Sequence, residues 1–143
     1  MSTAPLGEAT QLWLLWKRTH ERVRAEVISR TTVPADVSDP ELNVLVTLYQ
    51  TGGSLRQSEL ARELRWDRTR LSHLLTRMSR RGYIHRLKGV SGISVEILPQ
   101  GTELIETAAP GLEAAVQQHL IDQLGDADAH TLRALLQRLD TSD

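Results

Sequence analysis

The chain has 143 residues, of which 40% are hydrophobic and 24% charged, and this balance suits one packed core with helical extensions. It contains no cysteine, which excludes disulfide bonds, thiolate zinc sites and cysteine redox sensors. The sequence has no apolar run of about 18 residues, and its N-terminal residues lack a basic region followed by an apolar stretch. It therefore predicts a protein of the bacterial cytoplasm, with neither a membrane span nor a secretory signal.

The net charge of −1 conceals an uneven distribution along the chain. Residues 1–55 carry five basic and six acidic side chains, residues 56–88 carry ten basic and three acidic ones, and residues 89–143 carry two basic and nine acidic ones. A chain that concentrates positive charge in one third has the electrostatic pattern of a polyanion-binding protein. The alternative explanation for such a run of charge is a solvated helical face.

Two helices are expected in the first third of the chain. The first spans about residues 6–30, because its apolar residues recur at steps of three or four. It ends before Val33-Pro34, since the residue ahead of a proline disfavours helix. The second is predicted to begin at the capping box Ser38-Asp39-Pro40-Glu41 and to continue to about Gln50. Apolar residues surround its axis, which predicts a buried helix.

A helix-turn-helix pattern follows. Residues 56–64 predict a short helix, and Arg65-Trp66 a tight turn after it. Asp67 is a good N-cap for a further helix that reaches about Arg81, where Gly82 supplies the stop. The buried stripe of this second helix is predicted to consist of Leu71, Leu74, Leu75 and Met78.

Two strands and two further helices complete the predicted elements. Residues 83–87 and 93–97 are expected to form the strands, joined by the short loop 89–92, because apolar and polar residues alternate in the second of them. Pro99 opens a long helix that Pro110-Gly111 is expected to kink. Gly125-Asp126 separates it from a last helix with a narrow leucine stripe.

This order of elements predicts a mainly α protein with a small β-hairpin wing, that is, a winged helix-turn-helix. We expect an N-terminal dimerisation helix in residues 1–37, the winged helix-turn-helix in residues 38–98 and C-terminal dimerisation helices in residues 99–143. The first and last helices have apolar faces with little left to cover within one chain. A homodimer is therefore predicted.

The predicted helix 67–81 has side chains suited to the major groove of double-stranded DNA. Arginine donates to guanine O6 and N7, threonine contacts the thymine methyl group, and histidine bonds to base edges. Arg68, Thr69 and His73 are therefore the candidates for base contacts. Ser72 and Arg77 are the candidates for phosphate contacts, which fix the register of a protein on DNA without reading sequence.

Further DNA contacts are predicted around this helix. Gln57 and Ser58 open the preceding helix, where they can donate to a phosphate alongside its free amides. Arg86 and Lys88 stand in the wing, within reach of the neighbouring minor groove. Arg70 adds a further cation to the exposed stretch of the recognition helix.

The alternative is an ordinary solvent-exposed basic helix. Such a helix normally interleaves charges of both signs, whereas Asp67 is the only acidic residue between residues 64 and 95. We therefore favour DNA contact for the basic patch as a whole.

Four segments of the chain form a combined pattern that is specific, although no single segment is. They are Leu55-Arg-Gln-Ser-Glu-Leu-Ala-Arg-Glu-Leu, Asp67-Arg-Thr-Arg-Leu-Ser-His-Leu-Leu-Thr-Arg-Met, Arg81-Gly-Tyr-Ile and Val95-Glu-Ile-Leu-Pro-Gln-Gly101. The first three resemble the core of the MarR family of bacterial transcriptional regulators. The fourth is similar to the junction between strand and helix that follows the wing in that family.

The resemblance implies a homodimer with intertwined terminal helices, whose winged units straddle a pseudo-palindromic operator about one helical turn apart. It also implies a repressor that a small aromatic or phenolic effector releases from DNA. It supports roles on the recognition helix for Arg68, Thr69, Ser72, His73 and Arg77. The wing of the family usually carries an acidic residue and then an arginine two positions later, whereas residues 89–92 here read Gly-Val-Ser-Gly. This departure weakens the prediction that the wing tip reads the minor groove.

Trp13, Trp16 and His20 lie on one face of the first predicted helix. They are candidates for the wall of an aromatic-ligand pocket, as the resemblance allows, but we favour packing in a dimer core, because tryptophan buries a large area there. No two of the five histidines are spaced for a shared metal on a helix, and the nearby carboxylates form no recognisable ligand pattern. We expect neither a metal nor a cofactor.

An enzyme is not expected. The sequence has no nucleophile elbow, no phosphate loop, no HExxH motif and no carboxylate pair in a catalytic setting. The rival from another class is a protein-interaction or ligand-binding module that has kept the fold and lost operator binding. The altered wing favours this rival, whereas the arginines retained at positions 68, 70 and 77 count against it.

Overall fold

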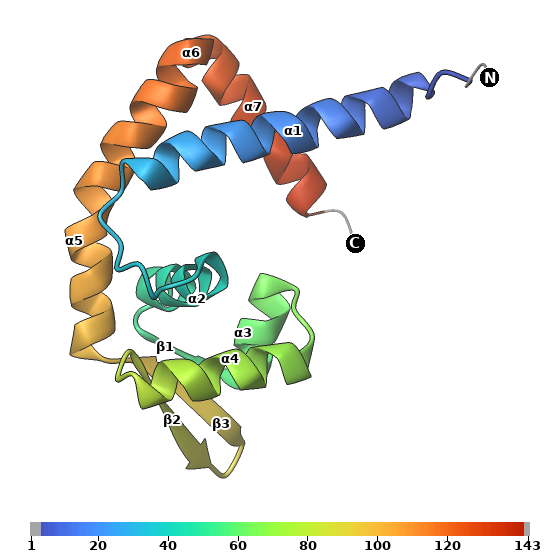
Figure 1. Ribbon diagram of the computed structural model, residues 1–143. Helices are drawn as coiled ribbons and strands as arrows, with labels where there is room; N and C mark the ends of the chain where they lie inside the picture. Colours follow the sequence, from blue (N-terminus) through green and yellow to red (C-terminus); the bar gives the residue numbers. More distant parts are fainter. Residues whose placement is uncertain (1–3, 142–143) are drawn as a thin grey trace. The chain divides into compact units, whose positions relative to one another are not determined.

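The computed structural model describes residues 4–141, which fall into two compact units (Figure 1). One unit is Thr32–Ala109, and the other is formed by the two ends of the chain, up to Thr31 and from Pro110. The fold is mainly helical with one small antiparallel sheet, as the sequence predicts. Among the described residues, no helix has the length and hydropathy that crossing a membrane requires.

The 32–109 unit begins with helix α2 (Asp39–Gln50), and the predicted capping box is present at its start. The Glu41 N–H donates to Ser38 Oγ at 3.3 Å, and the Ser38 N–H donates to Glu41 Oε1 at 3.2 Å. Val44, Leu45 and Leu48 are fully buried, and Leu42 and Val46 pack against the same core, which confirms that α2 is a core helix.

A short strand that the sequence analysis missed follows α2. Strand β1 (Ser54–Arg56) pairs antiparallel with β3, with Leu55 opposite Val95. The expected two-stranded hairpin is therefore a three-stranded sheet in the order β1-β3-β2. Arg56, predicted to open the next helix, instead ends the strand. A three-residue strand is too short to show alternation, and its pairing partners lie far along the chain.

The helix-turn-helix is confirmed by α3 (Gln57–Leu64) and α4 (Arg68–Arg80). Arg65 ends α3 in the left-handed conformation, with φ of 56°. Asp67 caps α4, since its carboxylate accepts a hydrogen bond from the Thr69 N–H at 3.2 Å. The predicted stripe is buried in full and attaches one face of α4 to the core: Leu71, Leu74, Leu75 and Met78.

The wing is a tight hairpin of β2 (Ile84–Gly89) and β3 (Gly92–Ile97). Gly89 pairs with Gly92, so the connection is shorter than the predicted loop 89–92. Gly92 has φ of +114°, a conformation that suits glycine. Val90 lies at the turn and is fully exposed.

Helix α5 (Pro99–Val116) approaches the sheet closely at its first turn. A Cβ atom at Gly101 would stand 2.7 Å from the Tyr83 carbonyl oxygen and 2.9 Å from Ile97 Cγ1. Glycine is therefore the residue that fits at this contact. It allows Leu104, one turn further on, to join the buried core of the unit.

The unit formed by the chain ends contains α1 (Glu8–Ser29), the end of α5, the π-helical turn η1 (Gln117–Ile121), α6 (Asp122–Leu124) and α7 (Asp126–Asp140). The predicted first and last helices are thus present. Helix α5 continues through Pro110, and the described departure from α-helical geometry lies in η1, which the sequence analysis did not anticipate.

This second unit leaves many large apolar side chains exposed to solvent. Trp13 and Trp16 on α1 are 57% and 50% exposed, and Leu139 on α7 is 56% exposed. The exposed apolar residues of these two helices include Leu12, Trp13, Leu14, Leu15, Trp16, Leu135, Leu136 and Leu139. A single copy of the unit therefore leaves two helical faces without a hydrophobic cover.

Candidate nucleic-acid interface

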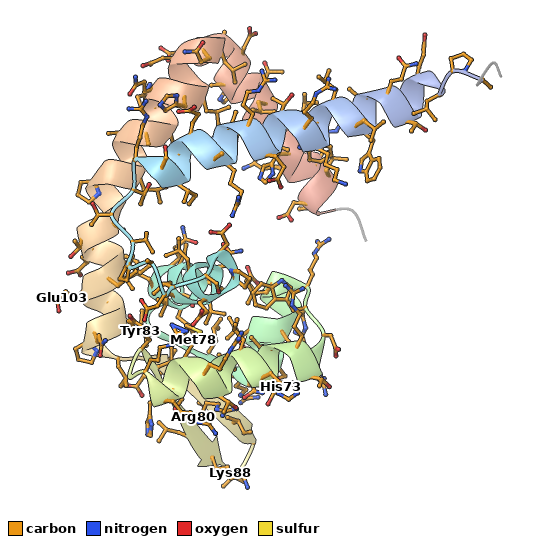
Figure 2. All side chains as sticks on the ribbon, viewed as in Figure 1. His73, Met78, Arg80, Tyr83, Lys88 and Glu103 are labelled. Atoms are coloured by element: carbon orange, nitrogen blue, oxygen red, sulfur yellow. The ribbon has the colours of Figure 1, made fainter. Side chains whose placement is uncertain are left out.

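Helix α4 presents a cationic face opposite its buried stripe. The exposed side chains of this helix include those of Arg68, Thr69, Arg70, His73, Arg77 and Arg80. Figure 2 shows His73 and Arg80 projecting from the side of α4 on which the wing with Lys88 extends. The predicted contacts on α4 are therefore accessible, except that Ser72 is half-buried.

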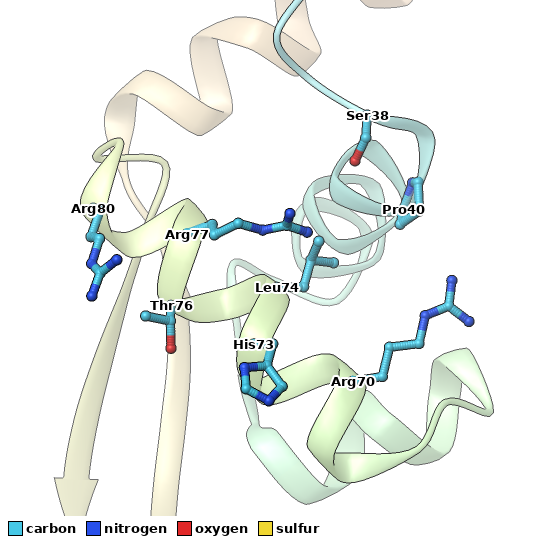
Figure 3. A pocket seen from close by; sticks show the side chains of 8 residues that line it. All are labelled: Ser38, Pro40, Arg70, His73, Leu74, Thr76, Arg77 and Arg80. Carbon is cyan, nitrogen blue, oxygen red and sulfur yellow. The ribbon is translucent and has the colours of Figure 1, made fainter.

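A cavity of about 770 Å³ lies beside α4, and its lining is strongly basic. It runs along the outer part of α4 to the start of α2 (Figure 3), and is lined by Ser38, Pro40, Arg70, His73, Leu74, Thr76, Arg77 and Arg80. Figure 3 shows Arg77 extending toward α2, whereas Arg80 points away from it. None of the lining residues is acidic, so the field of this cavity favours an anion.

A second cavity, of about 370 Å³, lies where α3, the start of α4 and the wing meet. Its polar lining includes Gln57, Ser58 and Arg68, with Ser91 at the wing turn. Arg56 provides no side-chain cap to α3, so the first amides of that helix have no capping partner from it. The structure thus brings together three residues that the sequence analysis predicted for DNA binding.

Gln57 has a buried side-chain oxygen, Oε1, for which the described residues supply no hydrogen-bond partner. An amide in this position can present either its oxygen or its nitrogen to a ligand after a rotation. The other polar side chains that line the cavity are hydroxyl groups and guanidinium groups, all of which can donate hydrogen bonds. The arrangement is suited to a phosphate oxygen placed at the start of α3.

Arg70 lies over the ring of Trp66, with its guanidinium carbon 5.0 Å from the ring centroid. This cation–π contact joins the turn of the helix-turn-helix to the first turn of α4. Arg70 is still exposed and lines the larger basic cavity, so the contact restrains its position without removing its charge from the surface.

The wing residues predicted for the minor groove differ in their surroundings. The Arg86 side chain is half-buried, and its Nη2 donates to Thr76 Oγ1 at 2.8 Å, so this guanidinium is bound to α4. Lys88 is exposed near the end of β2. The wing turn itself consists of Val90 and Ser91 and carries no charge. Of the two predicted wing cations, Lys88 is the one exposed to solvent.

The residues predicted for ligand binding lie on α1. Trp13, Trp16 and His20 are all exposed in the chain, and Lys17 Nζ lies 5.3 Å from the centroid of the Trp13 ring. The described residues contain no group of three or more histidine, cysteine, aspartate or glutamate side chains placed to hold a metal ion.

The sequence analysis overlooked one cluster of charged residues close to α4. Arg81, the C-cap of α4, reaches the start of α2, where it forms an ion pair with the buried Glu41 at 3.1 Å. Glu41 had been identified only as a member of the capping box. Its place in the first turn of a helix predicted to be buried was the available signal, since a buried carboxylate requires a partner.

The MarR family model matches residues 37–91, which include the helix-turn-helix and the first strand of the wing. AbsC, a MarR family transcriptional regulator from Streptomyces coelicolor, has a similar structure, with 25% sequence identity, a TM-score of 0.81 and 96% of each chain covered. No functionally curated protein matches the chain.

Two further solved structures share the fold. A mutant of MarR from E. coli, complexed with operator DNA, has 20% identity and a TM-score of 0.82, with 96% of this chain and 99% of that chain covered. PcaV from Streptomyces coelicolor, in complex with its natural ligand, has 18% identity and a TM-score of 0.80, with 99% and 100% covered. The chain therefore has a segment, residues 37–91, that matches the MarR family model, and it shares its winged helix-turn-helix fold with solved MarR family transcriptional regulators.

Proposed function

We propose that this protein regulates transcription by binding a specific DNA site as a homodimer, with α4 in the major groove. The observation that carries the proposal is the face of α4, where arginine, threonine and histidine side chains are exposed and no acidic residue interrupts them. An uninterrupted cationic face attracts the phosphate backbone, and the side chains between the cations supply the donors for base edges.

Within this proposal the α4 residues have separate roles. Arg68, Thr69 and His73 read bases, because they lie in the N-terminal half of α4, the part of a recognition helix that enters the groove. Ser72 and Arg77 bind phosphate groups and set the register of the protein. Arg70 adds to the same cationic surface.

The contacts outside α4 are phosphate and wing contacts. Gln57 and Ser58 bind a phosphate at the start of α3, where they share a basic cavity with Arg68. Lys88 contacts the DNA flank beside the wing, and Arg86 contributes from its position against Thr76.

Homodimer formation is supported by the exposed apolar faces of α1 and α7. Leucine and tryptophan side chains on two helices of one unit are left uncovered in a single chain, and a second copy of the chain can cover them. A two-fold dimer presents two copies of α4, so the operator is expected to be a pseudo-palindrome with half-sites about one helical turn apart.

A repressor released by a small aromatic effector is the mode of regulation that we propose. For the tryptophans of α1 we favour packing in the dimer interface. Trp13, Trp16 and His20 are also the candidate ligand contacts, since two indole rings and an imidazole on one helical face suit a planar ligand. The ligand complex of PcaV, a protein with this fold, is consistent with the idea.

Footprinting on the intergenic DNA upstream of the gene tests this function. We expect the purified protein to protect one site with two half-sites related by a pseudo-two-fold axis, at a stoichiometry of two chains per site. If the protein protects no site, and if it retards all DNA fragments equally in a gel-shift assay, the result would support the interaction-module alternative. The uncharged wing turn favours that alternative.

A further inference from the structure

Arg81 connects the end of the recognition helix to the start of α2. Its Nη1 donates to the Asp36 carbonyl oxygen at 2.7 Å and lies 3.8 Å from Asp36 Oδ2. Its Nη2 donates to Glu41 Oε1 at 3.3 Å and lies 3.1 Å from Glu41 Oε2. The Arg81 backbone N–H also bonds to the Arg77 carbonyl oxygen and so completes the last turn of α4. One residue therefore closes α4 and attaches it to the segment that leads into α2.

The carboxylate that pairs with Arg81 is buried. Glu41 is only 3% exposed, and it is the one buried charged residue among those the structure describes. Its Oε1 accepts hydrogen bonds from the Ser38 N–H at 3.2 Å, from Ser38 Oγ at 2.9 Å and from Arg81 Nη2 at 3.3 Å, whereas Oε2 lies 3.1 Å from Nη2 as an ion-pair contact and accepts no hydrogen bond from the described residues. Burial of a carboxylate costs free energy unless a cation lies beside it. The hydrogen bonds from Ser38, together with the ion pair, give the Glu41 carboxylate a defined orientation. Ser38 therefore orients the Glu41 carboxylate, and Glu41 in turn orients the Arg81 guanidinium.

The position of this pair links it to the basic face. Arg77 and Arg80 belong to the same last turn of α4 as Arg81, and Ser38 lines the large basic cavity together with them. A loss of the pair would leave the C-terminal part of α4 held by the apolar stripe and by the hydrogen bond from Arg86 to Thr76. The stripe fixes which face of α4 is buried. Apolar contacts are not directional, however, so small rotations and shifts of the helix cost little free energy.

We propose that Arg81 is a positioning residue, which acts through Glu41 to hold α4 in the orientation that reads DNA. The inference rests on the proposed function and deepens it. It differs from the simpler idea that Arg81 is one more phosphate anchor at the end of a basic helix. The two ideas predict opposite effects when the Glu41 charge is removed. A positioning role requires the carboxylate, whereas an Arg81 that binds phosphate would become more available to DNA without it.

Three variants separate these roles. Glu41→Gln keeps every cation and can keep the capping box, because glutamine serves at that position of the box, but it removes the charge that orients Arg81. Arg81→Ala removes the cation and leaves a buried carboxylate without a partner. It is therefore compared with the double variant Glu41→Gln/Arg81→Ala, in which no charge is left buried without a partner. Glu106→Gln is the matched control, since it makes the same change of side chain at an exposed position of α5 and leaves both acidic partners of Arg81 in place.

The experiment measures the affinity of each variant for upstream DNA and for random duplex across a salt series, at a temperature where thermal unfolding shows all of them folded. For a positioning role we expect Glu41→Gln to reduce the preference for specific DNA about tenfold with an unchanged salt slope. The double variant should lose no more preference than the single variant with the larger loss, and Glu106→Gln should retain the wild-type preference.

Other results would overturn the proposal. If Arg81→Ala shallows the salt slope by about one unit and weakens binding equally on both DNAs, while Glu41→Gln binds as well as the wild type or better, Arg81 is a phosphate anchor. If the wild type itself shows no preference, the proposed function fails and this inference falls with it. A selective wild type with a fully selective Glu41→Gln variant would remove the inference alone.

Discussion

Single arginines on α4 differ in their surroundings, and this difference predicts different effects on DNA binding. Arg68 lies at the start of the helix and lines the small cavity beside α3 and the wing. Arg77 lies near its end and lines the large cavity beside α2. Guanidinium groups of the same charge can therefore read a base at one end of the helix and hold a phosphate at the other.

The Arg77→Ala variant is expected to weaken binding to specific and random DNA equally, and to shallow the salt slope by about one unit, because one phosphate contact is lost. Arg68→Ala is expected instead to relax the preference at one base pair, at a cost of about 1–3 kcal/mol. Fluorescence anisotropy titrations with single-base-pair operator variants measure both effects. Arg133→Ala, which removes an exposed cation from α7, is the control. An equal loss on both kinds of DNA for Arg68→Ala would contradict the assignment.

Asp67 has two opposed effects on the same helix. Its carboxylate caps α4 through the Thr69 N–H, and its negative charge lies next to a cationic surface. We expect Asp67→Ala to lower the free energy of unfolding by about 1 kcal/mol through loss of the cap. Its affinity for random duplex should rise at low salt, since one repulsive charge is removed. Asp67→Asn, which can still cap, should keep the stability and show the same gain in affinity; a drop in affinity for both variants would be the contrary result.

At the scale of elements, the sequence predicted those structures whose cause is local. The capping box at Ser38, the cap at Asp67 and the buried stripe of α4 are short-range patterns, and all are present. Strand β1 was missed because its three residues depend on pairing with β3. The contacts of Arg81 with Glu41 and of Arg86 with Thr76 were missed for the same reason, since each joins elements whose relative placement only the tertiary structure fixes.

Contact between α5 and the sheet supplies a test at this scale. Gly101→Ala would place a Cβ atom within 3 Å of the Tyr83 carbonyl oxygen and of an Ile97 side-chain carbon. Overpacking of this kind costs about 1–3 kcal/mol, which we expect to measure as a loss in the free energy of unfolding. Gly89→Ala is the control, because a Cβ atom there would make only an ordinary contact, 3.6 Å from the Gly92 carbonyl oxygen. Equal stability of the two variants would show that α5 does not pack as described.

For the whole molecule, the exposed apolar faces of α1 and α7 predict the assembly. We expect the wild type to sediment as a dimer and Trp16→Asp to shift it toward monomer, because a charge would enter a hydrophobic interface. Analytical ultracentrifugation over a concentration series measures this shift. The control Glu103→Ala changes an exposed residue in the first half of α5. A Trp16→Asp variant that remains a dimer at all concentrations would place the interface elsewhere.

Charge is distributed unevenly over the whole molecule. The basic residues of segment 56–88 form the face of α4 and its surroundings, and the acidic ones of segment 89–143 lie largely on α5, α6 and α7. The net charge of −1 therefore gives no indication of DNA affinity, whereas its distribution does.

The most direct test of the central claim is the affinity of the purified wild-type protein for its own upstream intergenic DNA and for random duplex across a salt series. The account predicts a preference of about a thousandfold or more for the upstream DNA, with affinity for both falling as salt rises. Weak binding that is equal on both DNAs and disappears at modest salt would contradict it, because the cationic face of α4 would then attract DNA without reading it.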